Sequence, residues 1–290
     1  MVKKVFVIVN PASGKTEPIL SMLNSVLLGK VEYDIGITKK QGDGYTLAKN
    51  ALKKKYDIIA VYGGDGTVME AAAALYNRKT PLLILPGGTA NILSKEIGIP
   101  QNTTEALDLI VKNKIKYKKI DMGLMNKMPF AVAVNIGYTA KIMQGAKRKH
   151  KSKYGRLAYG ISAIKHKNPP SSLYTIHHDH GTSEIEGVAI VITNTANSGL
   201  SGLSIMSDIR IDDGKLDIFV VKNSDIASLI EIAKSAVLEK KPHENIMHIR
   251  SSKFKISINP GQLVECDDIF EEYSELTIQS RKNALTVIVP

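Results

Sequence analysis

The segment IIAVYGGDGT, residues 58–67, decides the fold class of this chain. Its apolar run, Ile58–Tyr62, predicts a buried strand, and the glycines that follow let the backbone turn sharply. The alanine-rich residues that come next, Val68–Tyr76, have the pattern of a helix. A strand, a glycine turn and a helix in this order form the unit from which parallel α/β sheets are built.

The same alternation runs through residues 1–125. Strands are expected at Val5–Val9, Tyr33–Thr38, Asp57–Tyr62 and Pro81–Pro86, and helices at Glu17–Leu28, Gly44–Lys54, Val68–Tyr76 and Ala90–Gly98. Strands of this kind, apolar throughout, predict a doubly wound parallel sheet that is covered by helices on both faces. A C-terminal strand near residues 284–290 is expected to return to this domain.

Residues 126–290 have a different character, with many strand-like runs separated by turn residues. The expected strands are Phe130–Ile136, Ser172–His178, Glu184–Asn194, Lys215–Val221, Lys253–Ile258 and Leu276–Val289. Two helices are expected among them, near Gly155–Lys165 and Asp225–Leu238. This half therefore predicts a second, antiparallel domain of the β-sandwich type.

Composition and charge exclude some classes of protein and favour others. The chain of 290 residues has no apolar run of about 18 residues, so no membrane-spanning helix is expected. Its single cysteine, Cys266, excludes an intramolecular disulfide framework and fits a cytoplasmic protein. The formal charge of +11 favours anionic partners, and the absence of tryptophan and of basic segments interleaved with aromatic residues argues against nucleic acid.

Three glycine-rich segments come directly after three of the expected strands. They are Asn10–Gly14, Gly63–Thr67 and Pro86–Asn91. In an open parallel sheet the carboxyl ends of the strands meet at one edge, where glycine lets backbone N–H groups approach phosphate oxygens. The carboxylate of Asp65 would repel phosphate unless a cation lay between them, which favours a nucleotide bound with Mg²⁺.

A single glycine pair at a strand end is more often a simple turn, but three such loops together favour phosphate binding. The loops are neither a Walker A motif nor a G-x-G-x-x-G motif, because the residues that define those motifs are missing.

These loops, together with Glu70, resemble the catalytic domain of the diacylglycerol kinase family, which includes bacterial diacylglycerol kinases and sphingosine kinases. Later stretches are also similar to that family: Asn135–Tyr138, Tyr154–Tyr159 and Ile211–Asp217. The resemblance implies an ATP-binding α/β domain, a β-sandwich domain, and an active site in the cleft between them. It implies a lipid kinase that uses ATP and Mg²⁺ to phosphorylate a lipid with a free hydroxyl group.

The resemblance also implies the roles of individual residues. The expected nucleotide-binding residues are Asn10, Pro11, Ala12, Ser13, Gly14, Thr38, Gly63, Gly64, Asp65, Gly66, Thr67, Glu70, Gly88, Thr89 and Asn91. A structural Mg²⁺ is expected on the side chain of Asp213 and the carbonyls of Arg210 and Lys215. From the residues alone, the stretch Asp212–Gly214 would be a plain hairpin turn.

The catalytic base of the family is the glutamate of a late Asp-Gly-Glu motif, and this chain has Glu265-Cys266-Asp267-Asp268 in its place. Matching the triplets makes Asp267 the expected base, with Asp268 and Glu265 left open, while Asp65 serves the metal. The alternative is an acidic hairpin tip with no catalytic role. Ile92 stands where bacterial diacylglycerol kinases often have aspartate, and Asp121 matches another acid of that magnesium-linked network.

Three other features are interpreted as structural or left open. The cluster of His177, His178 and His180 is expected to be a polar hairpin tip, because adjacent histidines on a strand point to opposite faces. Cys266 has no cysteine partner at metal spacing, so neither metal binding nor a nucleophilic role is expected. The basic run Lys147–Arg156 is either a solvated loop or a docking site for acidic headgroups.

Two other functions compete with the lipid kinase. An NAD kinase also carries Gly-Gly-Asp-Gly-Thr, although the loops Asn10–Gly14 and Pro86–Asn91 favour the lipid branch. A silent nucleotide or lipid sensor would explain the altered acidic motif. A lipid kinase is expected to be cytoplasmic and to contact an acidic membrane surface peripherally, and a homodimer is left open.

Overall fold

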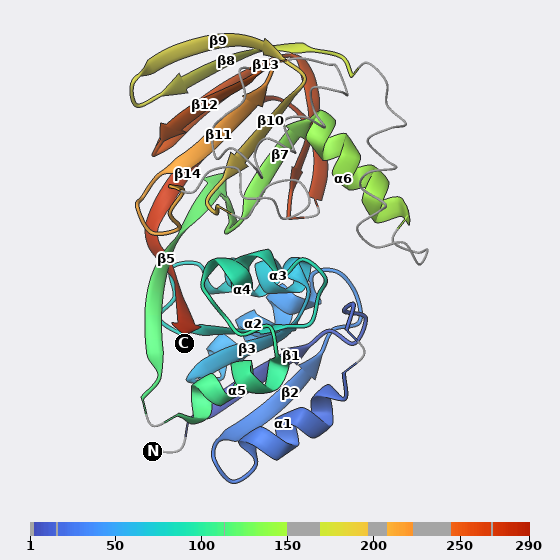
Figure 1. Cartoon of the computed structure of the whole chain (residues 1–290), viewed down its shortest axis with the longest axis vertical. Helices are drawn as coiled ribbons and strands as arrows, with labels where there is room; N and C mark the ends of the chain where they lie inside the picture. Colours follow the sequence, from blue (N-terminus) through green and yellow to red (C-terminus); the bar gives the residue numbers. More distant parts are fainter. Residues whose placement is uncertain are drawn as a thin grey trace. The chain divides into compact units, whose positions relative to one another are not determined.

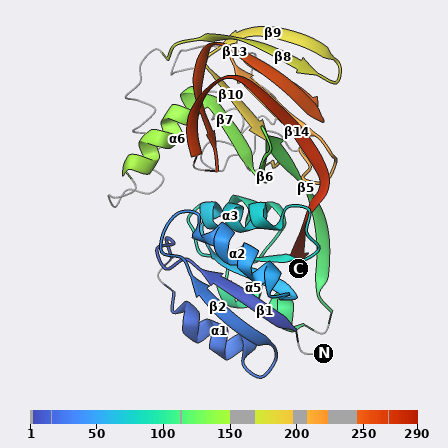
Figure 2. The ribbon, with the colours of Figure 1, turned by 180° about the vertical axis from the view of Figure 1, so that it is seen from behind.

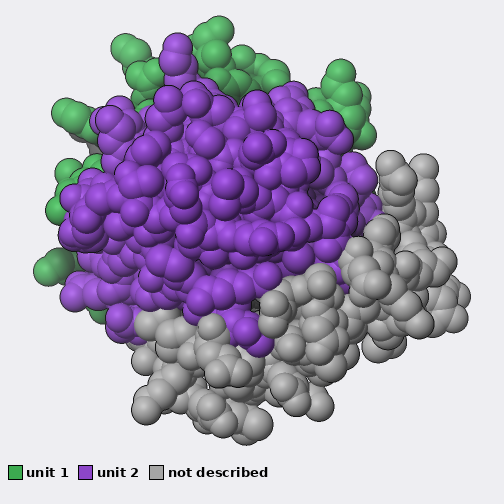
Figure 3. Space-filling model, turned by 90° about the horizontal axis from the view of Figure 1, so that it is seen from above, with its two compact units in different colours: residues 1–122, 282–290 green, residues 123–281 purple. Residues whose placement is uncertain are grey.

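The computed structural model describes residues 3–15, 17–112, 114–149, 169–196, 208–222, 245–267 and 269–290. Its residues form two compact units (Figure 3). Unit 1 contains residues 1–122 and 282–290, and unit 2 contains residues 123–281. Both predicted helices of the second half, near Gly155–Lys165 and Asp225–Leu238, lie outside the described residues.

Unit 1 is built on parallel strands in the order β4-β3-β1-β2. The strands are β1 (Lys4–Val9), β2 (Glu32–Ile37), β3 (Ile58–Gly63) and β4 (Leu82–Pro86). All residues of β3 and β4 are buried, because these central strands are covered on both faces. The predicted parallel α/β sheet is therefore confirmed.

Helices cover the two faces of this sheet, as Figures 1 and 2 show from opposite sides. They are α1 (Ile19–Leu27), α2 (Asp43–Lys53), α3 (Asp65–Leu75), α4 (Ile92–Glu96) and α5 (Thr103–Val111). Helix α1 packs with α5, and α2 packs with α3. The buried side chains of α1 include Ile19, Leu23 and Val26, whose spacing forms one apolar stripe.

The chain passes between the units within two strands, β5 (Lys116–Met125) and β14 (Ile269–Val289). The end of β14 lies parallel to β4 in unit 1, where Val287 pairs with Leu82. The Asn77 amide donates to the Ala284 carbonyl at 2.7 Å and so fixes the same strand. The C-terminal segment thus adds a strand to the sheet of unit 1.

Unit 2 is antiparallel and β-rich. Besides parts of β5 and β14, its strands are β6 (Met128–Phe130), β7 (Ala133–Gly137), β8 (Ser172–His178), β9 (Gly181–Gly187), β10 (Ala189–Thr193), β11 (Leu216–Val221), β12 (Ile246–Ser251) and β13 (Lys253–Cys266). The order is β12-β11-β10-β7-β13-β14, and β8 joins β13 to β9. Strand β13 pairs first with β8 and later with β7, and its pairing with β14 has a register shift between Ser257 and Gln262.

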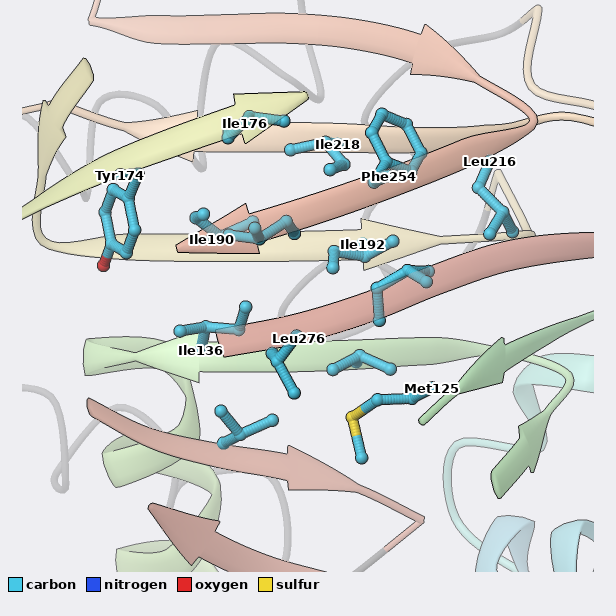
Figure 4. Close-up of a cluster of buried hydrophobic side chains, with 14 of the residues drawn as sticks. Met125, Ile136, Tyr174, Ile176, Ile190, Ile192, Leu216, Ile218, Phe254 and Leu276 are labelled. Carbon is cyan, nitrogen blue, oxygen red and sulfur yellow. The ribbon is translucent and has the colours of Figure 1, made fainter. Parts of the chain in front are cut away.

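The hydrophobic core of unit 2 is formed by buried side chains of its strands. Isoleucines of β7, β8, β10 and β11 gather there with Phe254 and Leu276 (Figure 4). A second cluster covers the other face of the strands, where Tyr138 and Ile142 of α6 (Tyr138–Lys149) pack on Val188, Ala189 and Val221. Strand β10 is buried throughout because both of its faces are covered.

Two predicted strands are wrong in extent. The stretch Glu184–Asn194 is divided at Val188, since β9 pairs with β8 whereas β10 pairs with β7 and β11. The stretch Phe130–Ile136 is divided in the same way, because β6 pairs with β5 and β7 pairs with β10. An apolar run shows burial but does not show where a strand changes its partner.

The sequence interpretation also missed α5, α6, β5 and β12. Helix α6 contains the first part of the basic run Lys147–Arg156, which therefore begins on a helix, and the rest of that run lies outside the described residues. Among the helices that the structure describes, none is both long enough and apolar enough to cross a membrane.

Candidate active site

The first glycine-rich loop is attached to the second by Asn10. Its backbone amide donates to the Tyr62 carbonyl at 2.9 Å, and its side-chain amide donates to the Thr67 hydroxyl at 2.8 Å. Its side-chain oxygen accepts from the Ala12 amide at 3.0 Å, which shapes the turn. Pro11, Ala12 and Gly14 are exposed, so the loop presents its backbone to solvent.

The loops also touch through their glycines. A Cβ added to Gly88 would lie 2.5 Å from the Gly64 Cα, so the backbones of the second and third loops meet there. A Cβ added to Gly14 would lie 3.1 Å from the Thr89 Oγ1, and the Lys15 amide donates to the Gly87 carbonyl at 3.0 Å. The three loops therefore form one continuous surface at the carboxyl ends of β1, β3 and β4.

Asp65 ties the second loop to the third through its carboxylate. The carboxylate accepts from the Asn91 amide at 2.9 Å and from the Ile92 amide at 2.6 Å. These amides open α4, so Asp65 caps that helix although it belongs to α3. Burial raises the pKa of this carboxyl, and the two amide hydrogen bonds act in the opposite direction. The sequence interpretation gave Asp65 a role in binding the nucleotide and its metal, and its capping role was missed.

Asn91 closes the third loop upon itself. Its Oδ1 accepts from the Gly88 amide at 3.0 Å and its Nδ2 donates to the Gly88 carbonyl at 3.0 Å. The backbone of Asn91 is left-handed, with φ of 51°, a conformation that asparagine tolerates better than most residues. The buried Asn91 is thus a structural part of the loop.

Glu70 and Thr38 lie beside the loops. Glu70 accepts from the Gly42 amide at 2.7 Å and from the Gly44 amide at 2.9 Å, so its carboxylate caps the start of α2. The buried Thr38 follows β2, and its amide donates to the Val9 carbonyl at 2.9 Å. The structure therefore brings both residues to the same end of the sheet as the loops.

This surface fits a phosphate chain. Glycine replaces side chains at the points where backbones approach one another, and Gly64, Gly66 and Gly88 remain partly accessible. Helix α3 begins at Asp65, so its N-terminal amides and the positive end of the helix dipole lie at the loops. Donors of this kind suit the oxygens of a nucleotide triphosphate.

Asp121 lies apart from the loops, on β5. It is buried, and its carboxylate accepts from the Asn283 amide at 2.8 Å. The residue therefore fixes the part of β14 that belongs to unit 1. Ile92, the apolar residue in the third loop, contributes its amide to Asp65.

The acidic stretch of unit 2 is a hairpin tip between β13 and β14. Cys266 pairs with Ile269, and Asp267 occupies the turn with a left-handed φ of 49°. Asp267 is half-buried, whereas Asp268 lies outside the described residues. Burial, and then the charges of Asp267 and Glu265, raise the pKa of the Cys266 thiol well above its ordinary value. This environment disfavours the thiolate and a nucleophilic role for Cys266.

Glu265 differs from Asp267 in its surroundings. It is 5% exposed, and its carboxylate accepts from the Asn135 side chain at 2.8 Å. Asn135 is also buried and stands opposite Glu265 in the pairing of β7 with β13. The sequence interpretation included both residues but missed their contact. Nearby, Gly137 is left-handed, and a Cβ there would lie 1.9 Å from the Gln262 Oε1.

The predicted magnesium turn precedes β11. The Asp213 carboxylate accepts from the Lys215 amide at 2.8 Å, and Gly214 has a left-handed φ of 78°. The Arg210 side chain lies 3.3 Å from the Asp212 carboxylate. A carboxylate and two carbonyls offer only oxygen ligands, which is the donor set that Mg²⁺ prefers.

The histidine cluster is a hairpin tip, as predicted. Strands β8 and β9 pair up to His178 and Gly181, and His177 and His178 interact with the hydroxyls of Thr182 and Ser183. Among the described residues, no group of three or more His, Cys, Asp or Glu side chains is arranged to hold a metal ion.

The fold and these loops define a two-domain protein with an α/β domain that carries three glycine-rich loops and a β-rich second domain. Comparison with known families then identifies it more closely. The family profile described as diacylglycerol kinase catalytic domain matches residues 4–125. The profile described as YegS C-terminal NAD kinase beta sandwich-like domain matches residues 132–288.

Relatives and a solved structure agree with these matches. A diacylglycerol kinase from Staphylococcus aureus is 26% identical over 264 residues, which cover 89% of this chain and 83% of that protein. One from Staphylococcus haemolyticus is 27% identical, covering 87% and 77%. The crystal structure of a diacylglycerol kinase from Bacillus anthracis is 26% identical, has a TM-score of 0.76, and covers 99% of this chain and 97% of that one.

The chain belongs to the diacylglycerol kinase family. It is accordingly a lipid kinase of the diacylglycerol kinase type, as the sequence predicted.

Proposed function

We propose that this lipid kinase transfers the γ-phosphoryl group of ATP, with Mg²⁺, to a hydroxyl group of diacylglycerol or a related lipid. The observation that carries the proposal is the contact among the three glycine loops at one end of the parallel sheet. Family membership supports the lipid acceptor, and the names of the relatives favour diacylglycerol.

In this proposal the loop residues bind the triphosphate. Backbone donors of Asn10–Gly14 and Gly63–Thr67 hold phosphate oxygens, and Thr89, exposed beside Gly14, adds a hydroxyl donor. Asp65 contributes through its cap on α4, which fixes the third loop against the second. A bound Mg²⁺ would supply positive charge that neutralises the phosphate oxygens.

Asp267 is the proposed general base. Its carboxylate accepts the proton of the lipid hydroxyl while the hydroxyl oxygen bonds to the γ-phosphorus and the bond to the leaving ADP oxygen breaks. The geometry favours Asp267 over Glu265, because the Glu265 carboxylate is 5% exposed and is bound by Asn135. Asp213, with the carbonyls of Arg210 and Lys215, is proposed to hold a structural Mg²⁺.

A transfer assay tests this proposal. The protein is incubated with Mg²⁺ and γ-labelled ATP over diacylglycerol, monoacylglycerol, ceramide, sphingoid bases, polyprenols, phosphatidylglycerol and archaeal diethers. We expect label on diacylglycerol or one related lipid, and a loss of about 10²–10⁴-fold in kcat for Asp267→Asn. Unchanged turnover by Asp267→Asn would remove that residue from the role of base.

A second candidate function is phosphorylation of NAD. The similarity of residues 132–288 to an NAD kinase beta sandwich-like domain is the observation that favours it. Formation of NADP from NAD and ATP, with every lipid left unlabelled, would replace the lipid proposal. Binding of ATP without turnover on any acceptor would instead support the sensor.

We also propose peripheral contact with acidic membranes, on the basis of the net charge of +11. Vesicles of phosphatidylglycerol should then pull the protein down more strongly at low salt than neutral vesicles do. Equal sedimentation with both lipids would contradict this contact. Homodimer formation stays a prediction.

A further inference from the structure

The turn of residues 208–215, which carries Asp213, is held at both of its ends by one side chain. Arg250 on β12 donates from Nε to the Asp217 Oδ1 at 2.8 Å. Its other two nitrogens reach Asp208, with Nη1 3.3 Å from Oδ2 and Nη2 3.3 Å from the backbone carbonyl. Arg250 therefore joins the residue that begins this turn to the strand that follows it.

The inner end of this bridge is the stronger one. The Asp217 side chain is 3% exposed, and its Oδ1 also lies 2.5 Å from the His248 Nε2. The side chain of Asp208 is 59% exposed, so water screens the outer ion pair. A charge-assisted bond to a buried carboxylate has a fixed geometry, and removal of one partner leaves a buried charge with fewer donors.

The two residues that follow Arg250 fix the same turn from another side. The Asp179 carboxylate accepts from the Ser252 amide and hydroxyl, both at 2.8 Å, and the Asp179 amide donates to the Ser251 hydroxyl at 2.9 Å. The Lys215 Nζ lies 3.5 Å from the same carboxylate. The segment 250–252 is thus connected to both sides of the turn.

We propose that Arg250 is a positioning residue for the magnesium site of unit 2. By linking Asp217 to Asp208 it holds the turn in the conformation in which the Asp213 carboxylate and the carbonyls of Arg210 and Lys215 bind Mg²⁺. The inference rests on the proposed metal role of Asp213. Preorganisation of this kind lowers the cost of ordering ligands when the ion binds.

Calorimetric titration of the full chain with Mg²⁺, without nucleotide or lipid, tests the inference. We expect Asp213→Asn to abolish Mg²⁺ binding at this site. Arg250→Gln should raise the dissociation constant for Mg²⁺ about tenfold. Arg250→Lys keeps the charge but loses the fork, so its affinity should fall between those of Arg250→Gln and the wild type. Arg281→Gln removes an exposed arginine of unit 2 and serves as the matched control.

Amide hydrogen exchange of the metal-free chain provides a readout that does not depend on the ion. Residues 208–215 should exchange faster in Arg250→Gln than in the wild type, and saturating Mg²⁺ should restore their protection. If Arg250→Gln does not unfold cooperatively, and so is not properly folded, Asp208→Asn is the second variant. It removes only the exposed ion pair between Arg250 and Asp208, and it should still accelerate the exchange of residues 208–215.

The outcomes separate the two claims. An Asp213-dependent site that binds equally well in the wild type and Arg250→Gln, with unchanged exchange at 208–215, overturns the role of Arg250 and keeps the metal site. Unchanged exchange in Asp208→Asn likewise contradicts the bridge. Mg²⁺ binding that survives Asp213→Asn overturns the metal site, and with it the inference.

Discussion

The glycine loops of unit 1 and the acidic turns of unit 2 are built on opposite principles. The loops meet through backbone, as Gly64 and Gly88 show, and most of their hydrogen bonds involve amides. The acidic turns depend on side chains from distant segments, such as Asn135 for Glu265 and Arg250 for Asp217. A site made of local backbone geometry is therefore more visible in a sequence than one made of long-range pairs.

The largest effect is expected at Gly88 of unit 1, whose backbone meets that of Gly64 in another loop. A Cβ at Gly88 would lie 2.5 Å from the Gly64 Cα, so Gly88→Ala must move two loops apart. A displacement of about 1 Å in a positioning loop can cost about 100-fold, and we expect that loss in kcat/KM for ATP. Steady-state kinetics measure it.

Gly64→Ala provides the comparison for this prediction. Its Cβ would lie 3.6 Å from the Gly88 Cα, an ordinary contact, so the loss should be smaller. Equal losses in the two variants would show that side-chain volume alone, and not contact between the loops, limits the site.

The next effect concerns the buried pair of unit 2. Asn135→Asp places a second carboxylate against Glu265, and we expect a loss of about 2 kcal/mol in unfolding free energy near neutral pH. The loss should shrink at acidic pH, since protonation of one carboxyl relieves the repulsion. Urea unfolding at pH 7 and pH 5 measures both quantities, with Asn135→Ala as the uncharged comparison. A loss independent of pH would contradict this account of the pair.

A smaller effect is expected when the cap on α4 is removed. Asp65→Ala leaves the amides of Asn91 and Ile92 without this acceptor and should cost about 1 kcal/mol. Burial raises the pKa of Asp65, so the folded state binds more protons than the unfolded state between the two pKa values. The contribution of this carboxyl to stability therefore falls as pH rises through that window.

Asp65→Asn should remove this pH dependence and keep one acceptor oxygen for the amides. Thermal unfolding measured across the acidic range checks both points. A wild-type profile that Asp65→Asn leaves unaltered would argue against a raised pKa.

The smallest effect is expected at Asp179, in the hairpin tip between β8 and β9 of unit 2. Hydrogen bonds from Ser252, then Ser251, and the charge of Lys215 hold the pKa of Asp179 well below its usual range. A depressed pKa contributes stability that is present above the unfolded value of about 4 and is lost as pH falls through the folded value. Asp179→Asn should weaken the protection of the Ser252 amide against exchange at pH 6, and the difference from wild type should narrow in strong acid. Equal protection of the Ser252 amide in the wild type and Asp179→Asn, both at pH 6 and in strong acid, would contradict the prediction.

The sequence predicted unit 1 well because its signals are local. Apolar runs such as Ile58–Tyr62 are buried as expected, and each glycine loop stands at the end of its strand. Its resemblance to a lipid kinase family is confirmed by the family matches. The caps that Asp65 and Glu70 supply were not predicted, because each carboxylate binds amides more than 25 residues away.

The site in unit 2 was harder to predict for the same reason. Asn135 and Glu265 are 130 residues apart and meet only through the pairing of β7 with β13. The division of Glu184–Asn194 into two strands likewise follows from pairing, which hydropathy does not encode. Arg250 lies on β12, a strand that the sequence interpretation did not include.

Hydrogen exchange of the full chain with and without Mg·ATP tests most directly whether the three loops act as one nucleotide site. We expect the nucleotide to protect residues 10–14, 63–67 and 86–91 together, and Gly88→Ala to reduce the protection of all three segments. Protection of a single loop, or of none, would contradict the claim that these strand ends bind the triphosphate jointly.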